Sequence, residues 1–424
     1  MSARPALDRP ASGRRVVVTG RGVLSPLGHD WPTVLAWLRT GRNAVRRYDE
    51  WGKYLGLNTR LGVPAQDFEL PDHYTRKATR SMGRVALLAT RASELALADA
   101  GLLGDPLVKG GKVGISYGSS AGTPSSMSDF GRMLAECNTQ YINATTYIKM
   151  MAHTAPVNMG VFFGITGRII TTSSACTSGS QGLGYAYEAI RAGKQVAMLA
   201  GGSEELDVTA TTVFDTLFAT SNDNDAPETT PRPFDATRNG LVVGEGACTL
   251  VLEDLEHAQA RGARIHAEIV GYGTNSDGQH VTQPNALTMA EAMRLALDDA
   301  GLAPEAISYV NAHGTATEHG DIAETTATHA VFGERMPISS LKSYTGHTLG
   351  ACGALEAWVT LEMLREGWFH PTANLRQVDP RCGRLDYILP SEDGGGRRID
   401  GEYAMSNNFA FGGINTSLVL RRWP

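Results

Sequence analysis

Cysteine is scarce in this sequence, and its spacing does not build a metal site. Five cysteines are spread over 424 residues, and no two of them stand in a C-x-x-C spacing. A sparse, odd-numbered set in a long chain indicates reduced thiols and argues against a disulfide framework. We therefore expect an intracellular, cytoplasmic protein.

Long apolar runs and a strong charge of one sign are also missing. No uninterrupted apolar stretch reaches the length of a membrane span, and residues 1–10 lack the apolar core of a signal peptide. The formal net charge of −6 gives no general attraction to nucleic acid or to anionic membranes. Gly20-Arg-Gly22 does not continue into G-x-G-x-x-G, which argues against a nucleotide site there. The sequence thus predicts neither a nucleic-acid partner nor a membrane partner.

What is present indicates a folded α/β protein. Hydrophobic residues make up 42% of the chain and charged residues 19%, as in globular proteins. Strand-like and helix-like segments alternate before and after roughly residue 260, as in layered α/β folds. These segments are residues 15–19, 86–103, 112–116, 182–192 and 195–200, and then 265–273, 289–300 and 307–311. This alternation predicts two similar halves, residues 15–262 and 263–424, although no literal repeat is visible.

Glycine pairs and polar stretches set the expected ends of these segments. The first strand is expected to stop at Gly20-Arg-Gly22, and the strand over 195–200 at Gly201-Gly202. Residues 221–239 are polar, contain three prolines and predict a loop. Two last strands, residues 403–406 and 416–420, are expected to flank a hairpin-like loop.

The most informative residue is Cys176, in Thr171-Thr-Ser-Ser-Ala-Cys-Thr-Ser-Gly-Ser180. Small residues surround it and a helical stretch follows. We therefore expect the positive partial charge of a helix N-terminus to favour the thiolate. A thiolate in this position is a candidate nucleophile. The alternative is a buried structural cysteine.

Two histidines on glycine-rich turns lie far downstream of Cys176. His313 follows the strand-like residues 307–311, and His347 stands between Gly346 and Gly350. We expect each histidine at the end of a strand-like segment, where α/β folds build their active sites. A thiol with two imidazole donors suits acyl transfer through a thioester. The alternative is that both imidazoles are solvated or structural.

Three charged residues accompany the histidines. Lys342 precedes His347 by five residues, and Asp321 and Glu324 follow His313 at the expected start of a helix. A buried Lys–Glu pair would hold the two histidines neutral and oriented. The alternative places all three charges in solvent.

Further motifs follow in a fixed order along the chain. They are Val17-Val-Thr-Gly20, Ala200-Gly-Gly-Ser-Glu-Glu205, Pro233-Phe-Asp-Ala-Thr-Arg-Asn-Gly240, Gly244-Glu-Gly-Ala247 and Ser406-Asn-Asn-Phe-Ala-Phe-Gly-Gly413. Together with the cysteine and histidine motifs, they resemble the elongating (I/II) β-ketoacyl-[acyl carrier protein] synthases. The resemblance runs almost from end to end. It implies the thiolase fold, with two pseudo-duplicated α/β halves in a layered α-β-α-β-α arrangement.

The resemblance also implies a reaction. Cys176 would take an acyl group from a phosphopantetheine thioester. His313 and His347 would then donate hydrogen bonds to a malonyl thioester as carbon dioxide leaves. The resulting enolate would attack the acyl group and extend a fatty acid, polyene or polyketide chain by two carbons. No metal or organic cofactor is implied.

Supporting roles follow from the same resemblance. Lys342 and Glu324 would support the histidines, and Thr315 and Thr317 would hydrogen-bond the pantetheine arm. The backbone N–H groups of Cys176 and Phe411 would form the oxyanion hole. Phe411 would in addition gate the acyl pocket.

The implied partner is an acyl carrier protein loaded with an acyl or malonyl group. Arg76, Lys77 and Arg80, with Arg84 one turn on, would dock it as cations on one helical face. The alternative is an ordinary solvated helix face. A dimer is implied, either of two identical chains or with a related ketosynthase subunit. Residues 127–163 are expected to line the pocket and the dimer interface, with plain core as the alternative.

The chain departs from the family pattern at two places. Ala410 and Ile414 stand where the family usually carries Gly and Thr, so a Cβ restricts the backbone beside the gate. Glu318-His319 follows Thr317, where the family often has Pro. These departures suggest an unusual acyl chain, such as a polyene or an aryl-primed one.

Two other classes of function stay open. A cysteine hydrolase would use Cys176 with one histidine, but it does not explain His347. A catalytically weak subunit, similar to a chain length factor, would use the same fold as a binding platform. Such subunits typically lack the nucleophile, and this chain has Cys176.

Overall fold

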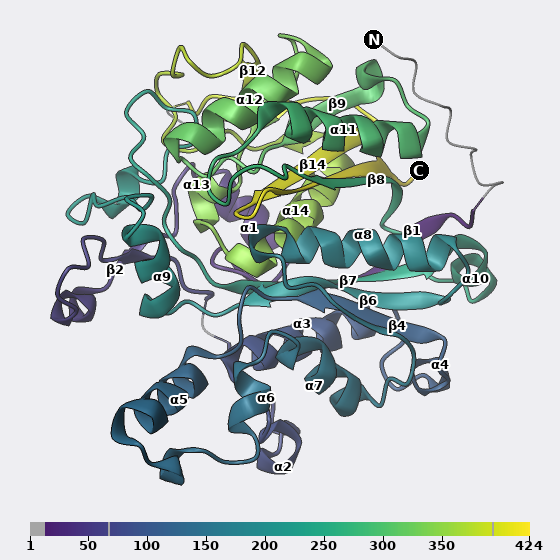
Figure 1. Cartoon of the computed structure of the whole chain (residues 1–424). Helices are drawn as coiled ribbons and strands as arrows, with labels where there is room; N and C mark the ends of the chain where they lie inside the picture. The colour runs from purple at the N-terminus through teal and green to yellow at the C-terminus, as the bar shows by residue number, and fades with distance from the viewer. Residues whose placement is uncertain (1–12, 67, 392–393) are drawn as a thin grey trace.

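The computed structural model describes residues 13–66, 68–391 and 394–424. Residues 1–10, which lack the apolar core of a signal peptide, lie outside these ranges. The described chain folds into layers in which helices alternate with β-sheet (Figure 1). Among the described residues, no helix combines the length and the apolar character needed to cross a membrane.

The N-terminal half forms one arm of a large mixed sheet. Its edge strands pair in parallel, whereas the strands next to the centre of the molecule pair antiparallel. From the edge inward, the strands are β5 (Ile169–Thr171), β4 (Val113–Gly118), β6 (Ala197–Glu204), β7 (Gly246–Asp254) and β1 (Val16–Leu24).

The C-terminal half repeats this order and these directions, with one further strand, β12, at its edge. From the edge inward, its strands are β12 (Asp386–Tyr387), β10 (Pro337–Ser339), β9 (Ile307–Asn311), β14 (Tyr403–Ala410), β15 (Ile414–Arg422) and β8 (Ala267–Ser276). The β12, β10, β9 and β14 pairs are parallel, and the β14, β15 and β8 pairs are antiparallel. Antiparallel pairing of β1 with β8 joins the halves into one sheet of eleven strands.

Helices cover both faces of each half and fill the space between the halves. The central layer consists of α8 (Ser178–Arg191) and α14 (Cys352–Glu366), which contact each other and strands of both halves. The outer layers contain α3 (Arg84–Asp99) and α7 (Thr154–Phe163) on one side and α11 (Ala286–Ala300) and α12 (Glu318–Phe332) on the other (Figure 1). This is the expected α-β-α-β-α arrangement.

The two halves do contain a literal repeat, so the expectation that none is visible is wrong. Leu95-Ala-Leu-Ala-Asp-Ala-Gly-Leu102 at the end of α3 and Leu295-Ala-Leu-Asp-Asp-Ala-Gly-Leu302 at the end of α11 agree at seven of eight positions. In each half the repeated helix packs on a strand that carries a Gly-x-Gly pair. The sequence around this short repeat has diverged between the two halves.

The Gly-x-Gly pairs allow helix packing and do not end the strands. A Cβ at Gly22 would lie 1.9 Å from the Ala92 carbonyl oxygen of α3, and a Cβ at Gly273 would lie 2.1 Å from the Ala292 carbonyl oxygen of α11. Strand β1 therefore continues through Gly20 and Gly22, with a register shift beside Gly20, and the expected turn there is wrong. Strand β6 likewise continues through Gly201-Gly202.

Other predicted elements are found with altered ends. The last two strands are longer than expected and leave only residues 411–413 between them. Helix α8 begins at Ser178 rather than at residue 182. Residues 221–239 contain only the short 3₁₀ helix Pro227–Thr229, as a loop requires. The proposed boundary between the two halves, at residues 262 and 263, falls between β7 and β8. It stays a proposal.

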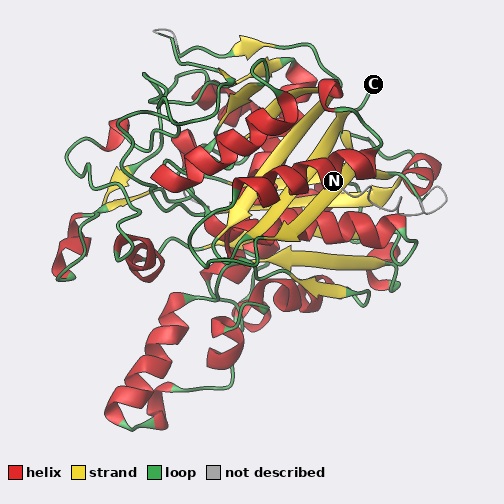
Figure 2. Cartoon of the chain, turned by 45° about the horizontal axis from the view of Figure 1, so that its top comes forward, coloured by secondary structure: helices red, strands yellow, loops and turns green. Residues whose placement is uncertain are grey.

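Smaller elements decorate the layers. Helices α5 (Pro124–Glu136) and α6 (Thr146–Met150) form an arm that extends away from the body (Figures 1 and 2). The remaining elements are α1 (Trp31–Leu38), α2 (Arg76–Thr79), α4 (Pro106–Lys109), α9 (Val208–Asp215), α10 (Leu255–Ala260), α13 (Lys342–Thr345), β2 (Arg46–Arg47), β3 (Leu61–Gly62), β11 (Trp368–Phe369) and β13 (Arg397–Arg398).

Candidate active site

A cavity of about 510 Å³ brings together the cysteine and the two histidines that the sequence singles out. Cys176, His313 and His347 all line it, although they come from both halves of the fold. Their side chains are almost entirely buried. The site therefore exists only when both halves are packed together.

Cys176 is held in a strained turn at the start of the central helix α8. It lies in the 3₁₀ helix Ala175–Thr177, and the preceding Ala175 has a left-handed backbone with φ of 51°. Ser178 stabilises the turn, because its Oγ donates to the Ala175 carbonyl at 2.7 Å and accepts the Ser174 N–H at 3.0 Å. Strain of this kind is typical of functional sites that need a fixed geometry.

His347 contacts the sulfur directly. Its Nε2 lies 2.9 Å from Cys176 Sγ, and its Nδ1 accepts the Leu349 backbone N–H at 3.2 Å. Because Nδ1 is occupied as an acceptor, the neutral ring carries its proton on Nε2 and donates toward the sulfur. His347 follows the one-turn helix α13, so the expectation of a strand immediately before it is wrong.

His313 lies beside His347 with the same tautomer. It follows β9 as expected, and its ring centroid lies 5.1 Å from that of His347. The Lys342 ammonium donates to His313 Nδ1 at 3.0 Å, which leaves the proton on Nε2. Burial lowers the pKa of both histidines well below the usual value, and the charge of Lys342 lowers each further. The site thus holds two neutral imidazoles.

The carboxylate that pairs with Lys342 is Glu356, not Glu324. Lys342 Nζ and Glu356 Oε1 form a buried ion pair, and Glu356 Oε2 accepts Asn408 Nδ2 at 2.7 Å. The sequence analysis did not identify Glu356 or Asn408. A signal was available for Glu356, because it is one of two acidic residues within the buried run of α14.

Glu324 acts on the backbone of the first histidine turn. Its two carboxylate oxygens accept the backbone N–H groups of His313 and Gly314, each at 2.7 Å. Burial raises the pKa of Glu324 to about 8, although these N–H groups favour the ionised form. Lys342 and Glu324 therefore both support His313, but through different atoms.

Comparison with known proteins decides the family. The profile of the β-ketoacyl synthase N-terminal domain matches residues 13–258, and that of the C-terminal domain matches residues 266–376. The chain belongs to the β-ketoacyl synthase family. Its fold is the thiolase fold, as the motifs implied.

The similarity to known proteins extends over almost the whole of this chain. The 3-oxoacyl-[acyl-carrier-protein] synthase 1 of Haemophilus influenzae is 35% identical over 420 residues, which are 97% of this chain and 99% of that protein. The crystal structure of a β-ketoacyl synthase from Burkholderia phymatum is 60% identical with a TM-score of 0.95, covering 97% of this chain and 100% of that one. The ishigamide ketosynthase/chain length factor is 32% identical with a TM-score of 0.87 and the same coverage.

The thiol of this ketoacyl synthase differs from the expectation of a thiolate. Burial raises the pKa of Cys176 to about 12. Lys342 and the backbone N–H groups of Phe411 and Cys176 act in the opposite direction without outweighing burial. The resting residue is therefore a thiol at neutral pH. The helix N-terminus was expected to decide the charge, but desolvation of the sulfur is the larger effect.

The remaining sequence-predicted residues of the pocket lie around the same cavity. Thr315 and Thr317 line it, with their hydroxyl oxygens 2.9 Å apart. Phe411 also lines it and is 36% exposed at the tip of the β14–β15 hairpin. Ala410 has an ordinary backbone in regular pairing with Ile414, so its Cβ causes no strain.

The structure does not bring the predicted docking cations to the cavity. Arg76, Lys77 and Arg80 are exposed, and none of them lines it. Helix α2 ends at Thr79, so Arg84 belongs to α3, where it pairs with Glu245 at 2.6 Å. The prediction that four cations share one face of a single helix is therefore wrong. Within the described part of the chain, none of residues 127–163 lines this cavity.

The hydrogen-bond donors around the site disfavour a metal ion. Ligand atoms of Cys176, His313 and His347 lie within 4.8 Å of one another. A metal on His347 Nε2 would need the ring proton on Nδ1, which faces the Leu349 N–H. His313 Nδ1 faces the Lys342 ammonium. The residues thus fit proton and hydrogen-bond donation better than metal ligation.

Proposed function

We propose that this protein is a β-ketoacyl-[acyl carrier protein] synthase that performs a decarboxylative Claisen condensation at Cys176. The observation that supports this most is the pair of neutral imidazoles beside a buried thiol, with Nδ1 of each ring accepting an N–H. A cysteine hydrolase uses one histidine and leaves the second imidazole unexplained. Two imidazoles that both donate from Nε2 match the developing enolate of the condensation.

The first step transfers an acyl group to the enzyme. The Cys176 sulfur attacks the thioester carbonyl of an acyl carrier protein, and the carrier leaves as its thiol with the proton that Cys176 gives up. The backbone N–H groups of Cys176 and Phe411 stabilise the tetrahedral oxyanion. Both N–H groups lower the pKa of the Cys176 thiol, which supports their proximity to the sulfur. Phe411 gates the acyl chain from the exposed hairpin tip.

The second step makes the carbon–carbon bond. His313 and His347 donate from Nε2 to the malonyl thioester oxygen, so charge that develops as carbon dioxide leaves is stabilised as an enolate. The enolate carbon attacks the acyl carbonyl on Cys176. The Cys176 thiolate then leaves and takes a proton, and the β-ketoacyl carrier is two carbons longer.

Four other residues hold these groups in place. Lys342 fixes the tautomer of His313, and Glu324 fixes the backbone that carries it. Thr315 and Thr317 hydrogen-bond the pantetheine arm as it passes through the cavity. Fixed positions matter because correct alignment of reacting groups accounts for much of catalysis.

The function is tested by supplying acyl-carrier and malonyl-carrier protein together. We expect stoichiometric release of carbon dioxide and a β-ketoacyl carrier, and no β-ketoacyl carrier with Cys176→Ala. A protein that hydrolyses the acyl thioester, and makes no condensation product with any chain length, contradicts the proposal. A panel that includes polyene and aryl acyl groups would identify the preferred chain.

We propose Arg76, Lys77 and Arg80 as the docking site for the acidic carrier, although they lie away from the cavity lining. Charge reversal by Lys77→Glu with Arg80→Glu should raise KM for carrier-bound substrates and spare a small pantetheine thioester. The matched control is Arg294→Glu with Arg335→Glu, two exposed cations of the other half. Equal loss with carrier-bound and small substrates would contradict docking at α2.

The protein is proposed to act in the cytoplasm as a dimer. All five cysteines are free, in keeping with a reducing compartment. The partner is a second copy or a related ketosynthase subunit, and sedimentation of the purified chain alone separates the two. A catalytically weak role within such a dimer is not favoured, because Cys176 and both histidines are in place.

A further inference from the structure

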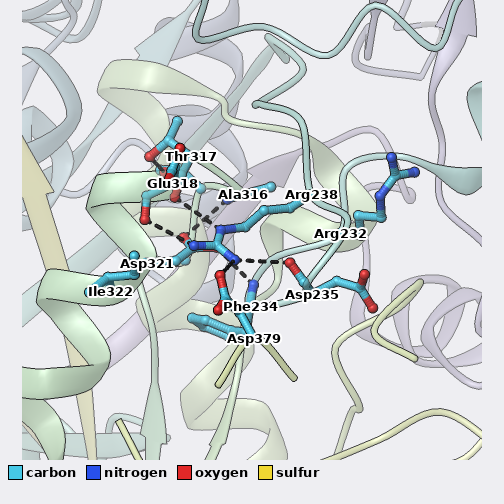
Figure 3. Close-up of polar contacts among 12 residues, drawn as sticks. Arg232, Phe234, Asp235, Arg238, Ala316, Thr317, Glu318, Asp321, Ile322 and Asp379 are labelled. Atoms are coloured by element: carbon cyan, nitrogen blue, oxygen red, sulfur yellow. Dashed lines mark hydrogen bonds and ion pairs between the residues drawn. The ribbon is translucent and has the colours of Figure 1, made fainter. Parts of the chain in front are cut away.

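Arg238 is the most heavily bonded side chain next to the active-site cavity, and no step proposed above uses it. It lies at the end of the 221–239 loop and lines the cavity. Its side chain is only 2% exposed. Figure 3 shows its guanidinium among residues that come from three separate segments of the chain.

One side of the guanidinium holds the turn between β9 and α12. Nε donates to the Thr317 carbonyl at 3.3 Å, and Nη2 donates to the Glu318 carbonyl at 3.0 Å. Nε also lies 3.4 Å from Asp321 Oδ2. Asp321 in turn accepts the Ala316 N–H at 3.2 Å. Arg238 thus contacts, directly or through Asp321, three consecutive residues of this turn.

The other side of the guanidinium is anchored to the body of the protein. Nη1 donates to the Asp235 carbonyl at 2.9 Å and to Asp379 Oδ2 at 2.7 Å (Figure 3). Lys has no planar group that donates in so many directions, so only an arginine can make this full set of bonds. The side chain is a rigid brace between the turn and the 379 segment.

The turn needs such a brace because its backbone is strained. Ala316 has a left-handed φ of 66°, which is unfavourable for a residue with a Cβ. The same turn carries His313 at its start and the hydroxyl groups of Thr315 and Thr317. A strained turn persists only where surrounding contacts determine it, and Arg238 bonds two carbonyl groups at its C-terminal end.

We propose that Arg238 is a positioning residue that fixes the turn over residues 313–318 for the condensation half of the reaction. The inference rests on the proposed function and deepens it. Cys176 and His347 lie on other segments, and within the described chain neither forms a hydrogen bond or ion pair with Arg238, so the sulfur and its neighbouring imidazole do not depend on the brace. Decarboxylation depends on the brace, because it is the half-reaction that uses the His313 imidazole.

The test separates the two half-reactions in Arg238→Met, Arg238→Lys and a control. We expect Arg238→Met to slow decarboxylation of a malonyl thioester by about tenfold to a hundredfold, as misplaced catalytic groups do. The rate of Cys176 acylation by a small acyl thioester without the pantetheine arm should stay within about threefold of wild type. Arg238→Lys should recover part of the decarboxylation rate, because it keeps the charge opposite Asp321 and Asp379.

Arg232 provides the matched control. It lies on the same loop, pairs with Asp223 at 2.9 Å and donates to the Thr237 and Thr229 carbonyls, but it does not reach the 313–318 turn. Arg232→Met should leave the ratio of the two half-reactions unchanged. Melting temperatures of all three variants report any general loss of stability.

Each outcome bears on one claim. Equal slowing of both half-reactions in Arg238→Met, or slowing of neither, would overturn the positioning role. If Arg238→Met does not fold, Arg238→Lys must still show the selective loss, and an unchanged ratio in that variant overturns the role. Wild-type protein that neither acylates Cys176 nor decarboxylates malonyl thioesters would instead contradict the proposed function.

Discussion

The two halves of the molecule each place a buried cysteine at the start of a central helix, but only one cysteine faces the cavity. Cys176 precedes α8, and Cys352 is the first residue of α14. Both are free and almost fully buried. Cys176 lines the cavity beside His347, whereas Cys352 Sγ donates to the Cys176 carbonyl at 3.2 Å and lines no part of it.

This contrast indicates that a helix N-terminus does not by itself make a cysteine reactive. Both sulfurs are at helix starts, and burial raises the pKa of both thiols. The two sulfurs differ in their neighbours. Cys176 has an imidazole N–H and two backbone N–H groups beside it, whereas Cys352 has the Asn408 amide and the Glu356 carboxylate nearby. The C-terminal half thus supplies the imidazole and one of the backbone N–H groups around Cys176, the proposed nucleophile.

Removing the imidazoles is the strongest way to break the contrast. His313→Ala and His347→Ala should each lower the decarboxylation rate by about 10²–10³-fold, the usual cost of losing one donor to a developing oxyanion. His347→Ala should also slow acylation of Cys176, because it alone of the two contacts the sulfur. Carbon dioxide release and adduct formation measure the two effects. Identical profiles for the two variants would contradict distinct positions for the two donors.

The buried ion pair on the Cys352 side should give the next largest effect. Glu356→Gln leaves the Lys342 ammonium buried without its carboxylate, which should lower the free energy of unfolding by about 3 kcal/mol. Urea denaturation measures this change. The control, Glu318→Gln, breaks an exposed pair with Arg381 and should have little effect. A loss in Glu356→Gln no larger than in the control would contradict a charged pair.

The pH dependence of alkylation sharpens the difference between Cys176 and an ordinary thiol. Because burial raises the pKa of Cys176 to about 12, its thiolate fraction is small at neutral pH and increases with pH. Its alkylation rate should rise about tenfold per pH unit between about pH 6.5 and about pH 9. Mass spectrometry of the Cys176 peptide follows the rate, with exposed Cys137 as an internal reference. A plateau below about pH 8 would show a thiolate at rest.

Ala410→Gly should have the smallest effect. Ala410 ends β14 with ordinary backbone angles, so glycine adds freedom beside Phe411 without relieving any strain. We expect a stability loss of about 0.5–1 kcal/mol and less than about a threefold change in the rate with any one acyl chain. A large shift in chain-length preference would show that Ala410 itself controls the gate.

Local patterns predicted much of the fold. The strand over residues 307–311 and the end of α3 before Gly101 agree with the sequence analysis. The predicted strand ends at Gly20-Arg-Gly22 and Gly201-Gly202 are wrong. These glycines accommodate close neighbours inside strands, and such packing depends on segments far away in sequence. The ends of hairpin strands were underestimated for the same reason, since cross-strand pairing extends them.

The site was predictable where a motif names a residue and unpredictable where tertiary packing chooses a partner. Cys176, His313 and His347 stand in recognisable motifs and do meet in one cavity. The choice of Glu356 over Glu324 for Lys342 depends on how α14 packs against β14, which no local pattern encodes. The thiol pKa likewise depends on burial that only the assembled halves produce.

The most direct test of the account is to locate the acyl group after a single incubation with an acyl-carrier thioester. Intact mass and peptide mapping of wild type, Cys176→Ala and Cys352→Ala would be compared. The account predicts one acyl group per chain on Cys176 in wild type and in Cys352→Ala, and no adduct in Cys176→Ala. An adduct on Cys352, or an adduct that survives Cys176→Ala, would contradict it.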